Sequence, residues 1–328
     1  MVSALFVNMG EKEEQMRYTR KLRNGIEMPY LGFGTWKLKG NQCTDTVQYA
    51  LENGYEAIDT AQVYLNEEAV GEGIRRSGKK REEIFVTTKV RNRFQGYDST
   101  LYAVEASLKR LGMEYLDLYL IHWPGEEMYV PTWKALVRLY EEGILRAVGV
   151  SNFYPEHMEA CAQETGVMPM VDQIEMHPYL VQYEIIDYCR EHNIFPVAWS
   201  PLAAAGESRK DRKTAKEEKS FRLESPLKDP VIIKIAENHQ KTPGQIILRW
   251  HIQNGFGAVP KSSNPGRIKE NREIFDFSLE ENEMHQIWNM TKRQIRIGDD
   301  GKTYRFPLLE ELIREGREPE KDRFGNYL

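Results

Sequence analysis

Eight short apolar runs recur along the chain with helix-like segments between them, and this alternation limits the possible fold more than any other feature. Strands that are joined by helices lie parallel, because a helical crossover returns the chain to the start of the next strand. Eight such units can close into a (β/α)8 TIM barrel of the α/β class. A length of 328 residues leaves one domain or two open, and the barrel interpretation favours one. The runs are LGFGTW, EAIDTA, IFVTTKV, LDLYLIHW, RAVGVSNF, VDQIEMHP, FPVAWSPL and GFGAVPKS.

Several segments lie outside this alternation. Two short alternating runs flank Asn24-Gly25, a dipeptide that favours a tight turn, so an N-terminal β-hairpin should precede the barrel. Near the end, FPLLEELIREG has the spacing of a short amphipathic helix, which predicts an extra C-terminal helical segment. The expected organisation is a single domain over 1–328, with an N-terminal extension at 1–17, the barrel at 18–290, a charged loop at 206–229 and a C-terminal tail at 295–328.

Composition narrows the possible functions and partners. With 45 Lys and Arg against 50 Asp and Glu, and 41% hydrophobic residues, the chain has the balance of a soluble globular protein, which favours neither a nucleic-acid nor a membrane partner. The opening MVSALFVNMGEKEEQ lacks the basic start and apolar core of an export signal. Cys43, Cys161 and Cys189 form no close pair, which is typical of reduced thiols. We therefore expect a cytoplasmic protein, a monomer or a weak homo-oligomer, that acts on a small molecule.

Polar residues stand at the carboxyl ends of the expected strands, where such barrels collect catalytic groups. Asp59 ends the second run with Tyr64 five residues later, Lys89 ends the third run, and His122 ends the fourth. A phenol with a pKa of about 10 exchanges protons poorly near neutral pH unless a nearby ammonium favours the phenolate. Lys89 can be that ammonium, and Asp59 can supply the opposing charge that a buried lysine needs. We therefore predict that Lys89 lowers the pKa of Tyr64. Tyr64 would then exchange a proton with a substrate oxygen, to which His122 also donates a hydrogen bond.

The motifs resemble the aldo-keto reductase superfamily, including its bacterial aldehyde reductase-like members. The matching pieces, in the same order, are DTAQVYLNEE, TTKV, LIHWP, GVSNF, VDQIEMHP, WSPL and VPKSSNPGRIKEN, and they cover roughly residues 18 to 290. The resemblance implies the (β/α)8 barrel and an NADPH-dependent carbonyl oxidoreductase that transfers hydride to an aldehyde or ketone. It also implies a catalytic tetrad of Asp59, Tyr64, Lys89 and His122, the same four residues that the chemical argument names.

A carbonyl reductase needs a hydride source, and a nicotinamide is the economical choice because the chain has no zinc or flavin signature. GEGIRR at Gly71 has only two of the three glycines of a dinucleotide-binding turn and lies in a helix-like run, so it does not indicate a Rossmann site. The resemblance instead implies that the K-S-x-x-x-x-R-x-x-E-N pattern binds the adenosine end of NADPH, with Lys261 and Arg267 on the 2′-phosphate. The cofactor-binding residues that it implies are Ser151, Asn152, Gln173, Trp199, Ser200, Leu202, Lys261, Ser262, Arg267, Glu270 and Asn271.

The nicotinamide end of this set departs from the family at one position. The resemblance implies that Ser151, Asn152 and Gln173 hold the carboxamide, a group that needs both donors and acceptors. Trp199 stands where the family usually has a Tyr that stacks on the nicotinamide ring. An indole can stack as well, so we expect the stacking to be kept.

The substrate pocket is expected to be lined by Trp36, Arg91, Phe94 and Trp123. Relatives often carry Trp two residues after the catalytic lysine, whereas this chain has Arg91 there. If Arg91 points inward, with Arg93 assisting, it offers a fixed cation to a carboxylate or phosphate, and the substrate is anionic or highly polar. The alternative is that Arg91 points outward or pairs with an acid of the C-terminal tail. The tail itself is expected to close one side of the pocket.

Two further function classes stay open. One is a barrel that binds NADPH tightly as a redox-sensing or regulatory subunit with little turnover, and a complete tetrad does not exclude it. The other is a metal-dependent hydrolase, for which His122, Asp172, Glu175 and His177 are the candidate ligands. Side chains alternate between the two faces of a strand, so these four cannot all face one cavity, and we expect no metal site.

Overall fold

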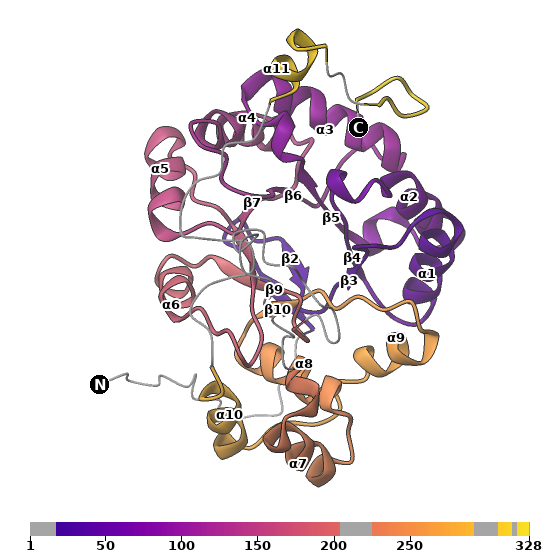
Figure 1. Ribbon diagram of the computed structural model, residues 1–328, viewed down its shortest axis with the longest axis vertical. Helices are drawn as coiled ribbons and strands as arrows, with labels where there is room; N and C mark the ends of the chain where they lie inside the picture. The colour runs from indigo at the N-terminus through magenta and orange to yellow at the C-terminus, as the bar shows by residue number, and fades with distance from the viewer. Residues whose placement is uncertain (1–17, 204–224, 292–307, 317–319, 328) are drawn as a thin grey trace, which may run out of the picture.

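The computed structural model describes residues 18–203, 225–291, 308–316 and 320–327, and its centre is a barrel of eight parallel strands (Figure 1). Neighbouring strands follow chain order from β3 to β10, and a parallel bridge between Leu31 and Ala258 joins the two ends of the sheet. The strands are β3 (Phe33–Gly34), β4 (Ala57–Asp59), β5 (Phe85–Val90), β6 (Leu118–Ile121), β7 (Val148–Ser151), β8 (Val171–Glu175), β9 (Phe195–Trp199) and β10 (Gly257–Ala258). All eight predicted strands are present, and the predicted (β/α)8 fold is confirmed.

Helices surround the strands on the outside of the barrel (Figure 1). None of the helices in the described ranges is long and apolar enough to cross a bilayer. The α-helices are α1 (Gly40–Glu52), α2 (Glu67–Arg76), α3 (Tyr97–Leu111), α4 (Tyr129–Glu141), α5 (Pro155–Thr165), α6 (Tyr183–Glu191), α7 (Pro230–His239), α8 (Pro243–Gln253), α9 (Pro265–Arg272), α10 (Glu281–Trp288) and α11 (Leu309–Arg314). Four short 3-10 helices are η1 (Gln62–Tyr64), η2 (Arg81–Glu83), η3 (Asn92–Phe94) and η4 (Pro226–Lys228).

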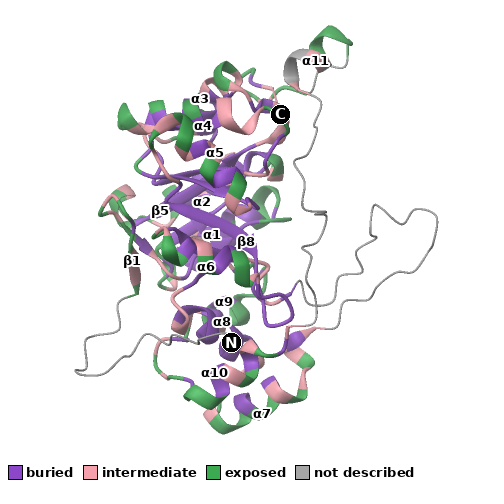
Figure 2. Cartoon of the chain, turned by 90° about the vertical axis from the view of Figure 1, so that its left-hand side faces the viewer, coloured by how far each residue is buried: buried purple, intermediate pink, exposed green. Residues whose placement is uncertain are grey.

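The core has two layers, one inside the barrel and one between the strands and the helices. Every residue of β5 is buried, as expected for a parallel strand that is covered on both faces. Figure 2 shows buried residues along the strands and exposed ones on the outer faces of the helices. Because side chains alternate along a strand, Lys89 points into the barrel while its neighbour Thr88 points outward and donates to Glu67 of α2.

The segments outside the barrel agree with the sequence where the structure describes them. The N-terminal hairpin pairs β1 (Thr19–Lys21) with β2 (Glu27–Pro29) in antiparallel register. Helix α11 forms within the predicted amphipathic segment of the tail. The extension at 1–17 and most of the charged loop, 206–224, lie outside the described residues.

Candidate active site

One cavity of about 1060 Å³ opens at the carboxyl ends of the barrel strands. Tyr64 and His122 stand in its wall together with Lys261 and Arg267, so a single space joins both groups. The predicted site residues that line this cavity are Trp36, Asp59, Tyr64, Arg91, His122, Trp123, Ser151, Asn152, Gln173, Trp199, Ser200, Leu202, Lys261, Ser262, Arg267, Glu270 and Asn271.

Two residues of the predicted site, Lys89 and Phe94, do not line this cavity. Lys89 is fully buried behind it and reaches Asp59. Phe94 is 2% exposed and packs against Tyr102 of α3, with ring centroids 6.2 Å apart, so it belongs to the core rather than to the pocket. The short helix η3 turns Phe94 inward, while its neighbours Asn92 and Arg93 line the cavity.

A buried ion pair lies next to Tyr64. Lys89 Nζ is 2.7 Å from Asp59 Oδ1 and donates to the carbonyl oxygen of Thr60 at 2.9 Å. The other carboxylate oxygen, Asp59 Oδ2, accepts from Gln173 Nε2 at 2.7 Å. The register of β4 and β5 explains the contact: Asp59 is opposite Thr87, and Lys89 follows two residues later on the same face. Both buried charges therefore have close partners, as such a pair requires.

Tyr64 ends the short helix η1, directly after β4, and is half-buried. The Lys89 ammonium lies 5.4 Å from the centre of the Tyr64 ring, and the His122 ring centre lies 5.9 Å from it. Burial and the charge of Asp59 raise the pKa of Tyr64, which is opposite to the direction predicted from the sequence. The reason is that Asp59 neutralises Lys89, and within the described residues no hydrogen bond joins Lys89 to the Tyr64 hydroxyl. Tyr64 therefore stays protonated near neutral pH.

His122 is held as a neutral ring. Burial and the charge of Lys89 lower its pKa to about 3. A neutral imidazole carries one N–H group, so it can donate one hydrogen bond into the cavity. The backbone carbonyl of His122 accepts from Asn152 Nδ2 at 3.0 Å, which ties the end of β6 to the end of β7. Tyr64 and His122 thus present two neutral donor groups at the same end of the cavity.

An amide-rich group occupies the floor beside these donors. Ser151 Oγ donates to the carbonyl of Gln173 at 2.7 Å and accepts from Asn152 Nδ2 at 3.0 Å. The Trp199 indole N–H donates to Asn152 Oδ1 at 2.9 Å. This contact was not predicted from the sequence, although a buried indole N–H usually has a hydrogen-bond acceptor. Asn152 adopts the left-handed conformation, with φ of 66°, that places its side chain between these partners. The edge of the half-buried Trp199 ring is therefore fixed.

Another part of the cavity wall is built by the starts of α8 and α9. Thr242 Oγ1 donates to Glu270 Oε1 at 2.6 Å, and the Arg267 backbone N–H donates to the capping Asn264 side chain at 3.0 Å. The exposed side chains of Lys261 and Arg267 stand at the rim. This wall also contains Thr242, Pro243 and Gly244, which the sequence analysis did not predict. The Thr-Pro dipeptide indicates the N-terminus of a helix, but no local sequence pattern indicates that this N-terminus faces the cavity.

Cations outnumber acids in the described cavity wall. Arg91, whose backbone N–H donates to Gln62 of the helix that ends at Tyr64, lines the cavity with Arg93 and with Lys37, which sequence reasoning missed, whereas the acids in the described wall are Asp59 and Glu270. Burial and the neighbouring charges of Arg93 and Arg110 lower the pKa of Arg91 to about 10, so it stays charged at neutral pH. Within the described residues, no acidic side chain forms an ion pair with the Arg91 guanidinium.

Residues 320–327 of the C-terminal tail lie against α2 and α3, where Asp322 contacts Arg110, Arg323 contacts Glu68, and Tyr327 contacts Tyr102. The other described tail residues include Leu308 and Glu311, which share a small pocket with residues 92, 95 and 125–128. The described tail residues therefore leave Arg91 unpaired and are absent from the cavity wall. Residues 295–307, for which closure of the pocket was also predicted, lie outside the described residues.

The candidate metal ligands do not converge. Glu175 and His177 are buried beside each other, with His177 Nε2 3.2 Å from Glu175 Oε1, and neither is in the described cavity wall that contains His122. Across the described ranges, no group of three or more His, Cys, Asp and Glu side chains is arranged to hold a metal ion.

Both the sequence and the structure of the chain are similar to those of known proteins. The sequence model of the Aldo/keto reductase family matches residues 30–291. A 9,11-endoperoxide prostaglandin H2 reductase of Trypanosoma cruzi is 46% identical over 88% of this chain and 96% of its own length. A glyoxal reductase of Bacillus subtilis is also 46% identical, over 86% of this chain and 96% of its own length. A crystal structure of a Gox0644 variant in complex with NADPH superposes with a TM-score of 0.78 at 40% identity, over 88% of this chain and 98% of that one.

Proposed function

This chain belongs to the aldo/keto reductase family, and from that premise we propose that it is an oxidoreductase that reduces an aldehyde or ketone to an alcohol with NADPH. The observation that carries the proposal is the single cavity that is lined both by proton-donating groups and by Lys261 and Arg267. Carbonyl reduction needs a donor beside the substrate oxygen, and a phosphorylated cofactor needs cations. The likeness to a glyoxal reductase and to an NADPH complex supports the same assignment.

The residues of the cavity fit the chemistry of NADPH. Ser151, Asn152 and Gln173 offer the donors and acceptors that a carboxamide needs, and Trp199 offers a flat ring with a fixed edge. At the rim, Arg267 suits a 2′-phosphate because its guanidinium can donate two parallel hydrogen bonds, and Lys261 adds a second positive charge. When bound, NADPH supplies the hydride.

Tyr64 would supply the proton. An alcohol is a much weaker acid than a phenol, so Tyr64 gives its proton to the developing alkoxide even where burial raises the pKa of Tyr64. His122 would donate a second hydrogen bond to the same oxygen. The Lys89 ammonium, held by Asp59, would stabilise the negative charge that Tyr64 carries after the transfer.

The cofactor assignment is tested by NADPH oxidation at 340 nm with a panel of aldehydes, with NADH as the alternative cofactor. The wild type should prefer NADPH, and Arg267→Leu should raise the dissociation constant for NADPH by about 10- to 100-fold, since a charged hydrogen bond to phosphate contributes about 1.5–3 kcal/mol. Its affinity for NADH should stay the same. Lys269→Leu, which removes a cation of α9 that lies outside the described cavity wall, is the matched control. Tight NADPH binding without turnover on any carbonyl would instead favour a regulatory, cofactor-binding barrel.

We further propose that the preferred carbonyl substrate carries a negative charge. Arg91, with Arg93 close by, adds positive charge to the cavity wall that contains Tyr64, and Lys37 lines the same cavity. Asp59, an acid of that wall, is already bound to Lys89 and Gln173. A carboxylate or phosphate on the substrate would accept two hydrogen bonds from the Arg91 guanidinium. None of the described residues provides such an acceptor.

Matched neutral and carboxylated aldehydes of equal length test this proposal. For the wild type, kcat/KM should be higher on the carboxylated aldehyde, and Arg91→Leu should lower it by about 10- to 100-fold on that substrate alone, as loss of a charged hydrogen bond predicts. Arg76→Leu removes an arginine of α2 that pairs with Glu72 on the surface, and it should leave both values unchanged. Equal kcat/KM values on the two aldehydes, in both the wild type and Arg91→Leu, would contradict the proposal.

A cytoplasmic location is also part of the proposal. Cys43, Cys161 and Cys189 are all buried free thiols, which is typical of proteins that work in a reducing compartment. Fractionation of cells that express the native chain, followed by immunodetection, tests the location directly.

A further inference from the structure

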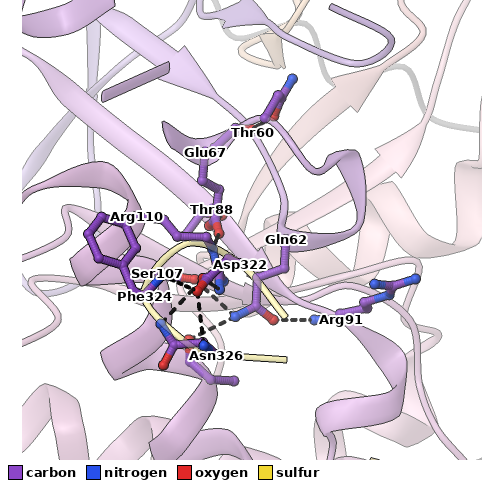
Figure 3. A network of polar contacts seen from close by, with 12 residues as sticks. Thr60, Gln62, Glu67, Thr88, Arg91, Ser107, Arg110, Asp322, Phe324 and Asn326 are labelled. Carbon is purple, nitrogen blue, oxygen red and sulfur yellow. Dashed lines mark hydrogen bonds and ion pairs between the residues drawn. The ribbon is translucent and has the colours of Figure 1, made fainter. Parts of the chain in front are cut away.

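The C-terminal loop, residues 320–327, is joined by buried charges to the helices beside the proposed site. The Asp322 carboxylate, 3% exposed, lies 3.1 Å from Arg110 Nη1 of α3. Arg110 is 7% exposed, and its Nε donates to Glu67 Oε2 of α2 at 2.7 Å. Figure 3 shows the three side chains close together, with Asp322 on the yellow C-terminal loop. One arginine thus connects the loop to the helix that follows Tyr64.

The loop is organised around the same carboxylate. Asp322 Oδ1 accepts from the backbone N–H groups of Phe324 and Asn326, each at 2.9 Å, and Oδ2 accepts from Asn326 Nδ2 at 3.3 Å. The backbone N–H of Tyr327 donates to the Tyr102 hydroxyl of α3 at 3.0 Å, which fixes the end of the loop. A carboxylate this buried is stable only with a paired charge, so docking of the loop depends on Arg110.

At its other end, the network reaches both sides of the Tyr64–Lys89 contact. Glu67 lies in the first turn of α2, three residues after Tyr64. Its Oε1 accepts from Thr88 Oγ1 at 2.7 Å, and Thr88 directly precedes Lys89 in β5. The Glu67 carboxylate therefore holds the segment that carries Tyr64 at a fixed distance from the strand that carries Lys89.

Helix α3 supports the site through a second side chain. Gln62 of η1 donates through Nε2 to the Ala103 carbonyl at 2.7 Å and to Ser107 Oγ at 3.0 Å. Its Oε1 accepts from the backbone N–H of Arg91 at 2.8 Å (Figure 3). The helix on which the loop docks is thus also the helix that holds η1 and the start of the Arg91 segment.

We propose that Asp322 is a positioning residue for the reduction: it holds Arg110, through Arg110 it holds Glu67, and so it fixes Tyr64 relative to Lys89. The inference rests on the proposed function, because it assigns Tyr64 and Lys89 to the reaction. It makes the C-terminal loop part of the active-site scaffold, although Asp322 lies 212 residues from Arg110 in the chain. The loop acts without touching the cavity.

The test uses the full chain with Asp322→Ala, which leaves a carboxylate-sized space beside Arg110. We expect kcat for NADPH-dependent reduction to fall about tenfold, since small misplacements of reacting groups slow catalysis strongly, while the dissociation constant for NADPH stays within about twofold. Added formate should restore most of the lost rate by occupying the space, and chloride at equal ionic strength should not. Arg323→Ala is the matched control. It removes a side chain of the same loop that forms an exposed ion pair with Glu68 of α2, and it should leave kcat unchanged.

Hydrogen exchange gives a second readout that does not depend on turnover. Backbone amides of residues 60–68 should exchange faster in Asp322→Ala and return toward the wild-type rate with formate. If Asp322→Ala folds poorly, Asp322→Asn, which keeps the shape and removes the charge, should show the same losses. Lower thermal stability with unchanged kcat and unchanged exchange at residues 60–68 would overturn the inference. If the wild type reduces no carbonyl, the proposed function fails, and the exchange rates alone decide whether Asp322 positions this segment.

Discussion

Replacing Tyr64 with Phe should lower kcat for carbonyl reduction by about a thousandfold, the effect expected for loss of a positioned general acid. The substitution removes one oxygen atom and keeps the ring, so the contact between the ring and the Lys89 ammonium persists. NADPH binding should be unchanged, because the Tyr64 hydroxyl is not among the groups assigned to the cofactor. Stopped-flow measurement of NADPH oxidation, with binding followed by protein fluorescence, separates the two quantities.

Two controls make this result specific. Tyr183→Phe removes a surface hydroxyl that donates to the Trp288 carbonyl, and it should leave kcat unchanged. Burial keeps Tyr64 protonated and His122 neutral, so neither group changes charge between about pH 6 and 8, and the wild-type kcat should be flat over that range. Residual turnover in Tyr64→Phe at more than about a tenth of the wild-type rate would assign the proton transfer to another group.

The barrel and the residues at its strand ends were predictable because each is encoded locally. An apolar strand-like run followed by a polar residue places that residue at the carboxyl end of a parallel strand, and this rule correctly placed Asp59 and His122 in one cavity. Phe94 was misplaced because the rule says which loop a residue occupies and not which way a short helix turns it.

Charges and long-range contacts were predicted less well. The sequence indicated that Lys89 and Tyr64 lie close together, but the sign of the pKa shift depends on how completely Asp59 neutralises Lys89 and how deeply Tyr64 is buried. The contact between Arg110 and Asp322 joins positions 212 residues apart, and neither position shows a local pattern that indicates the other. Only the folded chain brings such groups together.

Breaking the buried pair of Asp59 and Lys89 should give the largest change in stability. Lys89→Met leaves Asp59 buried with Gln173 as its remaining side-chain partner, and Asp59→Asn leaves Lys89 with a carbonyl but no opposing charge. Each should lower the free energy of unfolding by about 3–5 kcal/mol, since an uncompensated buried charge is unfavourable. Urea denaturation followed by fluorescence measures this quantity directly.

The double variant separates the structural role of the pair from its chemical role. Asp59→Asn combined with Lys89→Met contains neither charge, so its free energy of unfolding should lie closer to that of the wild type than either single variant does. Its turnover should stay as low as in Lys89→Met, because no ammonium remains to stabilise the charge on Tyr64. Removing the exposed pair of Lys109 and Glu105 in the same way should change neither quantity. Recovery of turnover together with stability would mean that the pair serves only the fold, and Lys89 would then lose its place in the reaction.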